Sequence, residues 1–301
     1  MHKIAAPLAP FFSYTAAMIE YPGFDSIALQ IGPLAIRWYG LMYLVGFGGG
    51  WWLGRRRAAA PGSPCTVEQV DDLLFYIALG VILGGRVGYM LFYNWSQLVK
   101  EPLSLFYIWQ GGMSFHGGFL GVLLGMYLFG RKIGRGFWEL TDFLAPLACI
   151  GLGAGRIGNF INGELWGRPT SLPWGMQVNC TDPRFGDLCY QQLGLPADAL
   201  VTPPLHPSPL YEAFLEGFVL FVVLWVFSAK LRPVRAVSAL FLLGYGLSRS
   251  VVEMVRLPDS HIDYLAFGWV TMGHLLTFPM LIVGVLLWWF AYQRPAAASG
   301  K

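Results

Sequence analysis

The sequence predicts an all-α polytopic membrane protein with about seven transmembrane helices and a small extracytoplasmic subdomain between spans four and five. Composition is the first reason: 55% of the 301 residues are hydrophobic and 12% are charged, whereas about 25% are charged in an ordinary soluble domain. The second reason is a series of apolar runs that approach the roughly 20 residues a helix needs to cross a bilayer. The net charge of +3 is too small to indicate nucleic-acid binding, so no nucleic-acid partner is expected.

Residues 1–36 are expected to form an N-terminal extracytoplasmic or interfacial segment. Four prolines interrupt its short apolar runs, which favours this interpretation over a secretory signal peptide. The first four helices fill residues 37–160 and are predicted at 37–54, 69–93, 111–130 and 138–160. Because every backbone polar group in hydrocarbon has to be hydrogen-bonded internally, these spans are expected to be helices. No alternation of apolar and polar residues competes with that assignment.

Residues 161–208 form the longest polar segment, and their seven prolines exclude a long helix. We expect a small irregular or partly β subdomain resting on the membrane. Cys180 and Cys189 share this segment and could form a disulfide if it faces an oxidising compartment, so the sequence leaves both states open. The last three helices fill residues 209–291, at 209–229, 236–256 and 271–291, and residues 292–301 are expected to be a cytoplasmic tail.

The basic residues of the connecting segments orient the chain, because cytoplasmic loops of membrane proteins carry an excess of Lys and Arg. The groups that fall on one side are residues 55–57, Arg131 with Lys132 and Arg135, Lys230 with Arg232 and Arg235, and Arg294 with Lys301. The opposite loops contain only scattered basic residues. The N-terminus is therefore expected outside the membrane and the C-terminus in the cytoplasm.

Residues 151–168 are the most informative stretch, since they place Arg156, Asn159, Asn162 and Glu164 where an apolar helix gives way to water. An ionisable group at membrane depth costs roughly 2.5–3.5 kcal/mol, so it indicates function by default. The alternative is a helix end whose polar groups cap it and face the headgroups. The many glycines favour a site, because they remove side chains that would otherwise screen the polar groups. The stretch predicts an active site that faces lipid.

A second cluster consists of Arg249, Glu253 and Arg256, which share one face of the predicted sixth helix. These residues could be an internal salt bridge that carries the charges into the bilayer. Two arginines against one carboxylate leave a surplus positive charge, however, and a guanidinium binds phosphate in a bidentate fork. Anion binding is therefore the favoured interpretation.

His116 lies between two glycine pairs, at 111–112 and 117–118, near the outer end of the predicted third helix. A lone histidine is more often a packing residue, but the glycines are expected to open space around the ring. Histidine is the usual proton acceptor near neutral pH. Neither a metal-binding nor a nucleotide-binding motif occurs in the sequence, so no metal and no cofactor are expected.

Taken together, the motifs resemble those of the bacterial prolipoprotein diacylglyceryl transferases. The stretch Gly-Arg-Ile-Gly-Asn-Phe-Ile-Asn-Gly-Glu-Leu-Trp-Gly-Arg at 155–168 is similar to the signature of that family. Further similarities follow in the expected order at 36–43, 85–94, 115–118, 206–212 and 249–256. The resemblance implies transfer of a diacylglyceryl group from phosphatidylglycerol to the lipobox cysteine thiol of prolipoprotein signal peptides, with release of glycerol phosphate. It also implies a location among the lipids of the bacterial cytoplasmic (inner) membrane.

The resemblance assigns roles to the candidate residues. Expected to be catalytic are His116, Arg156 and Arg249; expected to bind substrate are Tyr39, Arg86, Asn159, Asn162, Glu164, Gly167, Glu253 and Arg256. The two catalytic arginines would stabilise negative charge on the departing phosphate, and His116 would take the proton of the attacking thiol. Glu164 and Glu253 are expected to orient the arginines.

Two rival functions remain compatible with arginines near the outer leaflet. One is a lipid flippase or anion transporter, which also needs arginines in a membrane cavity. The other is a lipid-binding factor without catalytic activity. Both rivals predict that no covalent product forms.

Overall fold

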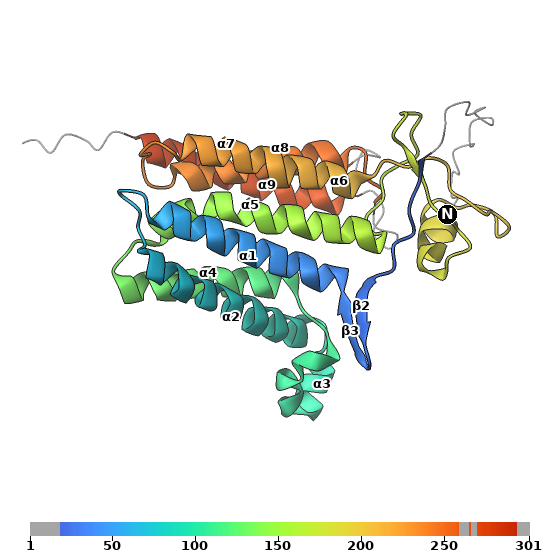
Figure 1. The fold of residues 1–301 in the computed structure, drawn as a ribbon, viewed down its shortest axis with the longest axis horizontal. Helices are drawn as coiled ribbons and strands as arrows, with labels where there is room; N and C mark the ends of the chain where they lie inside the picture. The colour runs from blue at the N-terminus through green and yellow to red at the C-terminus, as the bar shows by residue number, and fades with distance from the viewer. Residues whose placement is uncertain (1–18, 259–264, 266–269, 294–301) are drawn as a thin grey trace, which may run out of the picture.

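The fold is a bundle of long helices that run side by side, with a small compact unit at one end (Figure 1). The computed structural model describes residues 19–258, 265 and 270–293. The long elements are α1 (Trp38–Ala58), α2 (Val67–Phe92), α4 (Phe115–Ile133), α5 (Phe137–Asn162), the continuous run of α6 (Ser208–Glu212), η5 (Ala213–Val219) and α7 (Leu220–Phe227), α8 (Ala236–Glu253) and α9 (Met272–Tyr292). Each predicted span coincides with one of these elements. Arg294 and Lys301 of the expected tail lie outside the described residues.

Five of the helices are long and apolar enough to cross a membrane: α2, α5, the run 208–227, α8 and α9. The chain is therefore a mostly helical, polytopic membrane protein. Helices α1 and α4 do not reach the same mean hydropathy, because both are rich in glycine and both end in basic residues.

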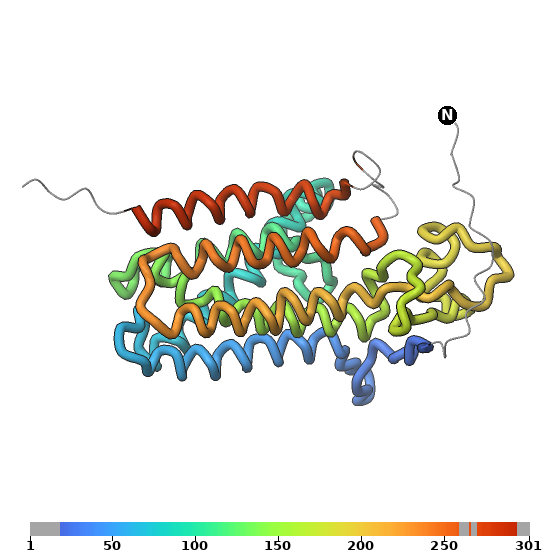
Figure 2. The backbone as a smooth tube through the Cα atoms, turned by 90° about the horizontal axis from the view of Figure 1, so that it is seen from above, coloured from blue at the N-terminus to red at the C-terminus, as the bar shows by residue number. Residues whose placement is uncertain are grey.

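Helix α5 lies near the middle of the bundle, between α1 and the run 208–227 (Figures 1 and 2). Glycines allow these close approaches. A Cβ at Gly153 would lie 3.0 Å from the Cα of Gly217, and a Cβ at Gly46 would lie 3.0 Å from the Cα of Gly151. The run 208–227 contains a π-helical segment, η5, and such segments are frequent at functional sites.

Helices α2 and α4 pack backbone to backbone at one side of the bundle. A Cβ at Gly84 would lie 2.3 Å from the carbonyl oxygen of Gly117, and one at Gly121 would lie 2.0 Å from that of Gly80. Small residues at four-residue spacing are typical of helix pairs in membranes, where close van der Waals packing replaces the hydrophobic effect.

The insert between α5 and α6 folds into a compact unit at the end of the bundle. It contains β4 (Met176–Gln177), η3 (Pro183–Phe185) and the π-helical η4 (Asp187–Gln192). Strand β4 pairs in parallel with β1 (Ile19–Glu20), so the N-terminal segment belongs to the same unit. The hydroxyl of Tyr21 donates to the carbonyl oxygens of Phe160 and Ile161, at 3.0 and 2.7 Å. The core of the unit consists of Tyr21, Trp166, Val178, Cys180, Phe185, Leu188, Cys189 and Leu205.

The structure resolves the state of the four cysteines. Cys180 and Cys189 form a disulfide inside the insert unit. Cys65 and Cys149 are free and buried. Burial raises the pKa of Cys65, in the connection between α1 and α2, to about 11.

Two projections extend from the bundle below the insert unit (Figure 1). One is a hairpin of β2 (Ile27–Ile31) and β3 (Leu34–Arg37), and the other contains α3 (Trp95–Lys100), η1 (Pro102–Phe106) and η2 (Ile108–Gln110). Both carry exposed apolar side chains, among them Leu29, Ile31, Leu34, Trp95, Val99, Leu103, Phe106 and Trp109. The chain is mostly helical as predicted, but the β2–β3 hairpin was not predicted, because strands of five and four residues leave little alternation to read.

Candidate active site

A buried cluster of arginines and glutamates joins α5, α6, η5 and α8. Arg156 of α5 binds two carboxylates of the run 208–227: its Nη1 lies 3.1 Å from Glu212 Oε2 and its Nε lies 3.2 Å from Glu216 Oε2. Arg249 of α8 pairs with Glu212 through Nη1 and with Glu253 through Nη2, the latter at 2.7 Å from Oε2. The cluster thus brings together residues separated by up to 97 positions along the chain.

Glu212 is the centre of the cluster. Its carboxylate pairs with Arg156 and Arg249, and its Oε1 also lies 3.5 Å from Nη1 of Arg256. The side chain is 0% exposed. A buried carboxylate is costly unless it is paired and hydrogen-bonded, so the arginines are what make its position tolerable.

Local sequence explains why the cluster assembles. Arg249 and Glu253 are four residues apart on a regular helix and therefore share a face. Arg156 lies one turn after Gly153, and Glu216 directly precedes Gly217. Because those two glycines let α5 and η5 approach backbone to backbone, Arg156 reaches Glu216 without displacing intervening side chains.

The cluster corrects the expected charge balance. The sequence suggested two arginines against Glu253 alone, whereas the structure adds Glu212 and Glu216, so three arginines face three carboxylates. Exposure is nevertheless unequal. The side chains of Glu212 and Glu216 are 0% exposed, while those of Arg156 and Arg249 are 17% and 13% exposed. The more accessible side chains of the cluster are therefore those of arginines, which suits an anionic ligand.

A second polar group lies at the end of α5. Asn159 Nδ2 donates to Glu164 at 2.9 Å, and Asn162 Nδ2 donates to the other oxygen of the same carboxylate at 3.2 Å. Gly163 adopts the left-handed conformation that ends the helix, and this turn folds Glu164 back over the last helical turn. Glu164 therefore holds two amides in this structure, whereas it was expected to orient an arginine.

Gly167 has a packing reason to be glycine. Its amide donates to the carbonyl of His206 at 2.9 Å, and the next amide, of Arg168, donates to the carbonyl of Val255 at 2.7 Å. A Cβ at Gly167 would lie 2.6 Å from both the Cβ of His206 and the carbonyl oxygen of Val255. Gly167 thus lets the segments after α5, before α6 and after α8 meet at one point.

Arg86 is buried on α2, and its guanidinium faces the backbone of the α3–η2 projection. Nε donates to the carbonyl of Leu105 at 3.1 Å, and Nη1 and Nη2 donate to the carbonyls of Gly111 and Ser104, each at 2.5 Å. All three nitrogens are used in this way, which favours a structural role over the expected substrate contact.

Tyr39 packs over Gly158 of α5, where a Cβ would lie 2.9 Å from its ring. Its ring also contacts Tyr43, at 5.3 Å between centroids. Tyr39 therefore lies in the α1–α5 interface and contacts the residue that directly precedes Asn159.

His116 lies apart from the arginines. It is exposed in the first turn of α4, which packs mainly on α2, and its ring contacts Phe115 at 5.7 Å between centroids. The neighbouring glycines were expected to open space around the ring, but two of them make other contacts. Gly112 accommodates Tyr89, and Gly117 contacts the backbone of α2. Among the described residues no hydrogen bond joins His116 to the cluster.

A hydrogen-bonded chain of aromatic residues lies beside Glu212. Trp174 Nε1 donates to the hydroxyl of Tyr211 at 2.7 Å, and that hydroxyl lies 3.1 Å from Nδ1 of His206. Burial lowers the pKa of His206, which favours the neutral ring, in which Nδ1 can accept the tyrosine proton.

Sequence reasoning missed Glu216 and gave Glu212 no role. Glu216 is a carboxylate within an apolar run long enough to span a membrane, and that alone was a usable signal. Its partner, Arg156, is 60 positions away, and nothing in the sequence indicates that pairing.

Fold and site together define a class of protein: a polytopic membrane protein whose helices bury carboxylates and leave arginines accessible to an anionic ligand. The chain belongs to the prolipoprotein diacylglyceryl transferase family, whose model matches residues 26–290. It is 56% identical over 278 residues to the phosphatidylglycerol–prolipoprotein diacylglyceryl transferase of Solidesulfovibrio magneticus, covering 92% of this chain and 98% of the relative. It is 54% identical to the enzyme of the same name from Oleidesulfovibrio alaskensis, covering 94% and 99%. For the Pseudomonas fluorescens enzyme the identity is 51%, covering 92% and 97%. The family predicted from the motifs is thereby confirmed.

Proposed function

We propose that this chain transfers the diacylglyceryl group of phosphatidylglycerol to a cysteine thiol of a prolipoprotein, the reaction for which its relatives are named. The sulfur attacks a glycerol carbon, a C–S bond forms, and the C–O bond to phosphate breaks. The bonding electrons leave with glycerol phosphate, and the thiol proton is released. The observation that carries the proposal is the unequal exposure of the cluster, with arginines accessible and carboxylates buried.

Arg156 and Arg249 are assigned to the phosphate. Negative charge increases on the departing phosphate as the C–O bond breaks, and fixed donors in a site shielded from water stabilise such charge well. Glu212 pairs with both arginines and so fixes their spacing before the lipid arrives. Arg256 and Glu253 complete this arrangement.

Asn159, Asn162, Glu164 and Tyr39 are assigned to the headgroup and the approaching peptide, since they surround the last two turns of α5. His116 stays the candidate base for the thiol. Gly167 and Arg86 are assigned to the shape of the site rather than to direct contacts. The peptide substrate is expected to be the lipobox segment of a signal peptide, which supplies the cysteine.

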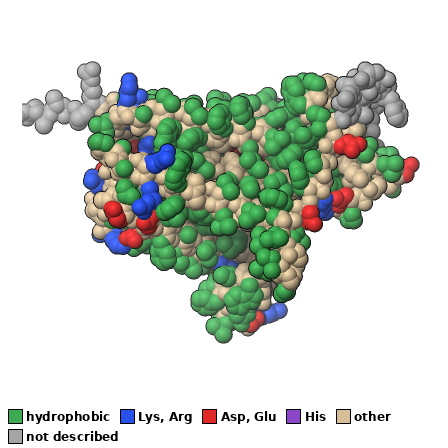
Figure 3. Space-filling view, viewed as in Figure 1, with side chains coloured by type: hydrophobic (Ala, Val, Ile, Leu, Met, Phe, Trp, Pro, Cys, Tyr) green, Lys and Arg blue, Asp and Glu red, His purple; other side chains and the backbone are tan. Residues whose placement is uncertain are grey.

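We further propose seven membrane spans, with the insert unit outside the cytoplasmic membrane of a bacterium and the C-terminus inside. Helices α1 and α4 have 21 and 19 residues, close to the roughly 20 that a span requires. Basic side chains gather over the end of the bundle away from the insert unit (Figure 3), including residues 55–57, Arg131 and Lys132. The disulfide at the opposite end supports an oxidising compartment there.

The test uses purified protein in detergent with phosphatidylglycerol and a lipobox peptide, and mass spectrometry of the peptide. The unmodified protein should give a diacylglyceryl adduct on the cysteine and an equal amount of glycerol phosphate. Arg249→Ala should lower kcat about 10²- to 10³-fold, because one donor to the departing phosphate is lost. Arg249→Lys should recover part of the rate, since it keeps the charge but loses the fork.

Arg55→Ala is the matched control. Arg55 is likewise paired with a carboxylate, that of Asp71, but at the other end of the bundle. Removing its guanidinium should therefore leave transfer near the unmodified rate. A folded Arg249→Ala protein with normal turnover would contradict the assigned role. No adduct from unmodified, folded protein would support a lipid transporter instead.

A further inference from the structure

Glu253 is held from two sides by two different helices. Its Oε2 forms an ion pair with Nη2 of Arg249 of α8 at 2.7 Å, and its Oε1 accepts from the hydroxyl of Thr271, at the start of α9, at 2.6 Å. The carboxylate also rests on the first turn of α9, where a Cβ at Gly273 would lie 2.4 Å from Glu253 Cδ. Both Glu253 and Thr271 are buried.

The direction of the hydrogen bonds follows from the chemistry. An ionised carboxylate only accepts, so the single hydroxyl proton of Thr271 points to Glu253. Nδ1 of His274 lies 3.2 Å from the same hydroxyl oxygen and 3.4 Å from the backbone amide nitrogen of Thr271. In one tautomer the ring donates to the hydroxyl oxygen and in the other it accepts from the amide. Either way, the hydroxyl of Thr271 keeps donating its proton to the hydrogen bond with Glu253.

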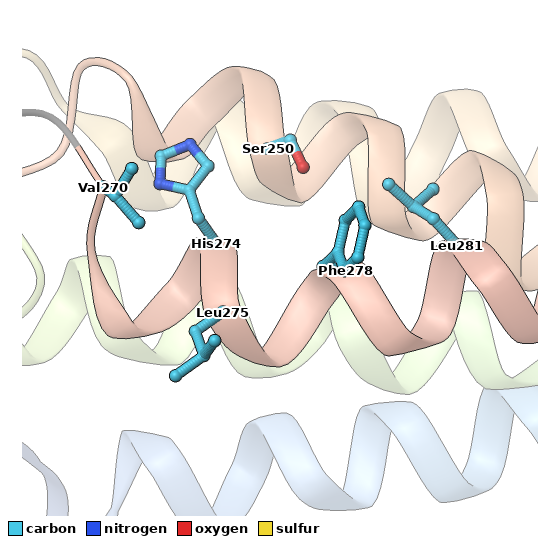
Figure 4. Close-up of a pocket in the computed structure, with 6 residues that line it drawn as sticks. All are labelled: Ser250, Val270, His274, Leu275, Phe278 and Leu281. Carbon is cyan, nitrogen blue, oxygen red and sulfur yellow. The ribbon is translucent and has the colours of Figure 1, made fainter. Parts of the chain in front are cut away.

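Packing between α8 and α9 is uneven around this position. Farther along the helices the interface is tight: a Cβ at Gly246 would lie 2.7 Å from Leu281, and one at Gly284 would lie 2.9 Å from Leu243. Next to the site α8 and α9 also border an open pocket of about 300 Å³. It is lined by Ser250, Val270, His274, Leu275, Phe278 and Leu281 (Figure 4). Ser250 directly follows Arg249, so the loosely packed region adjoins the cluster.

We propose that Thr271 is a positioning residue for diacylglyceryl transfer: its hydroxyl clamps Glu253, and through Glu253 it keeps Arg249 directed at the phosphate. The inference rests on the proposed role of Arg249. Without the hydroxyl, Glu253 loses a buried partner, and the open pocket nearby leaves room for the neighbouring side chains Ser250 and His274 to move. Arg249 would then lose its fixed position even though its charge is intact, and errors of about 1 Å in a catalytic group cost on the order of 100-fold in rate.

The test compares Thr271→Val, which keeps the shape but removes the hydroxyl, with Thr271→Ser, which keeps the hydroxyl. Transfer to the lipobox peptide should fall in Thr271→Val by about 10- to 100-fold in kcat. The KM for phosphatidylglycerol should change little, because the charge on the phosphate increases only as the bond breaks. Thr271→Ser should restore most of kcat. Thr271→Ala provides a second variant without the hydroxyl should the valine variant not fold.

Thr277→Val is the matched control. Thr277 is equally buried on α9, but its hydroxyl donates to the carbonyl of Gly273 and does not contact Glu253, so kcat should stay near that of the unmodified protein. A double-variant cycle adds a test of the route: if Thr271 acts through Glu253, then Thr271→Val should cost little more in a Glu253→Gln background.

Normal kcat in Thr271→Val, an equal loss in Thr271→Ser, or additive effects with Glu253→Gln would each overturn the inference. These outcomes differ from a failure of the proposed function, in which the unmodified protein itself forms no adduct.

Discussion

At the scale of single residues, Glu212 makes more ion pairs than any other described residue of the site. It binds arginines from α5, α8 and the segment after α8, and so it connects three parts of the chain through one carboxylate. Breaking a buried ion pair by removing one partner typically costs about 3–5 kcal/mol, because the remaining charges stay buried. The same arrangement fixes the arginines before substrate binds, which is what a site that stabilises developing charge requires.

His116 allows a prediction that separates a base from a packing residue. The thiol of a free cysteine has a pKa near 8.5, so a base matters most below that pH. His116→Gln should therefore slow transfer by about 10²-fold or more near pH 7, and the deficit should shrink as the pH is raised through about 8.5. The measurement is the pH profile of kcat/KM for the lipobox peptide.

His206→Gln is the comparison variant for that profile, because His206 is a second imidazole near the cluster, with its own partner in Tyr211. A constant deficit of His116→Gln across the pH range would contradict a role as base. The exposed position of His116 then would indicate a role in peptide binding.

The sequence located the arginines of the site but not their partners. Arg156 and Arg249 stand out because a charge within an apolar run is visible without a structure. The link from Arg156 to Glu216 depends on how α5 meets η5, which is a property of two glycines 64 positions apart and of their packing. Thr271 had no signal, because a threonine before a helix is common at any helix start.

At the scale of elements, the closest approaches of α2 and α4 depend on glycines of both helices. Gly121→Ala should lower the stability of the folded protein by about 1–3 kcal/mol, because the added methyl meets the backbone of α2, which cannot move aside as a side chain can. Thermal unfolding in detergent measures the change.

Gly118→Ala is the control on the same helix. A Cβ at Gly118 would lie 3.5 Å from its nearest neighbour, an ordinary contact, and alanine is the better helix former. It should therefore leave the unfolding temperature unchanged or raise it. Equal losses in the two variants would show that backbone contact is not what makes Gly121 sensitive.

The helices were predictable as elements because each needs a long apolar run, and runs of that length are hard to miss. The functions of the glycines were not. Gly117 was expected to open space at His116, yet it contacts α2, and Gly167 was expected to contact substrate, yet it lies where three backbone segments meet. A glycine in a sequence signals close approach without saying what approaches.

At the scale of the whole molecule, the two ends of the bundle differ in charge and in covalent structure. The disulfide of the insert unit closes a loop with a sequence separation of 9, and loops of that size are stabilised by about 2–3 kcal/mol. Replacing Cys180 and Cys189 together by serine should therefore lower the unfolding temperature. The change should be matched by adding reductant to the unmodified protein.

Reductant provides the control as well, since it should have no further effect on the double serine variant. If reductant does not change the unfolding temperature of the unmodified protein, and non-reducing peptide mapping finds both thiols free, then the disulfide does not form. One support for placing this end outside the cytoplasm would then be lost.

The burial of the remaining two cysteines has a practical consequence for the chemistry of the assay. Cys65 and Cys149 are enclosed in the fold, and the other two sulfurs are bonded to each other. An alkylating reagent such as a maleimide, added to a working mixture, would then titrate the peptide sulfhydryl without competition from the catalyst. Samples quenched with the reagent at intervals would report progress as the disappearance of that one reactive group, and no thiol of the protein would react in its place.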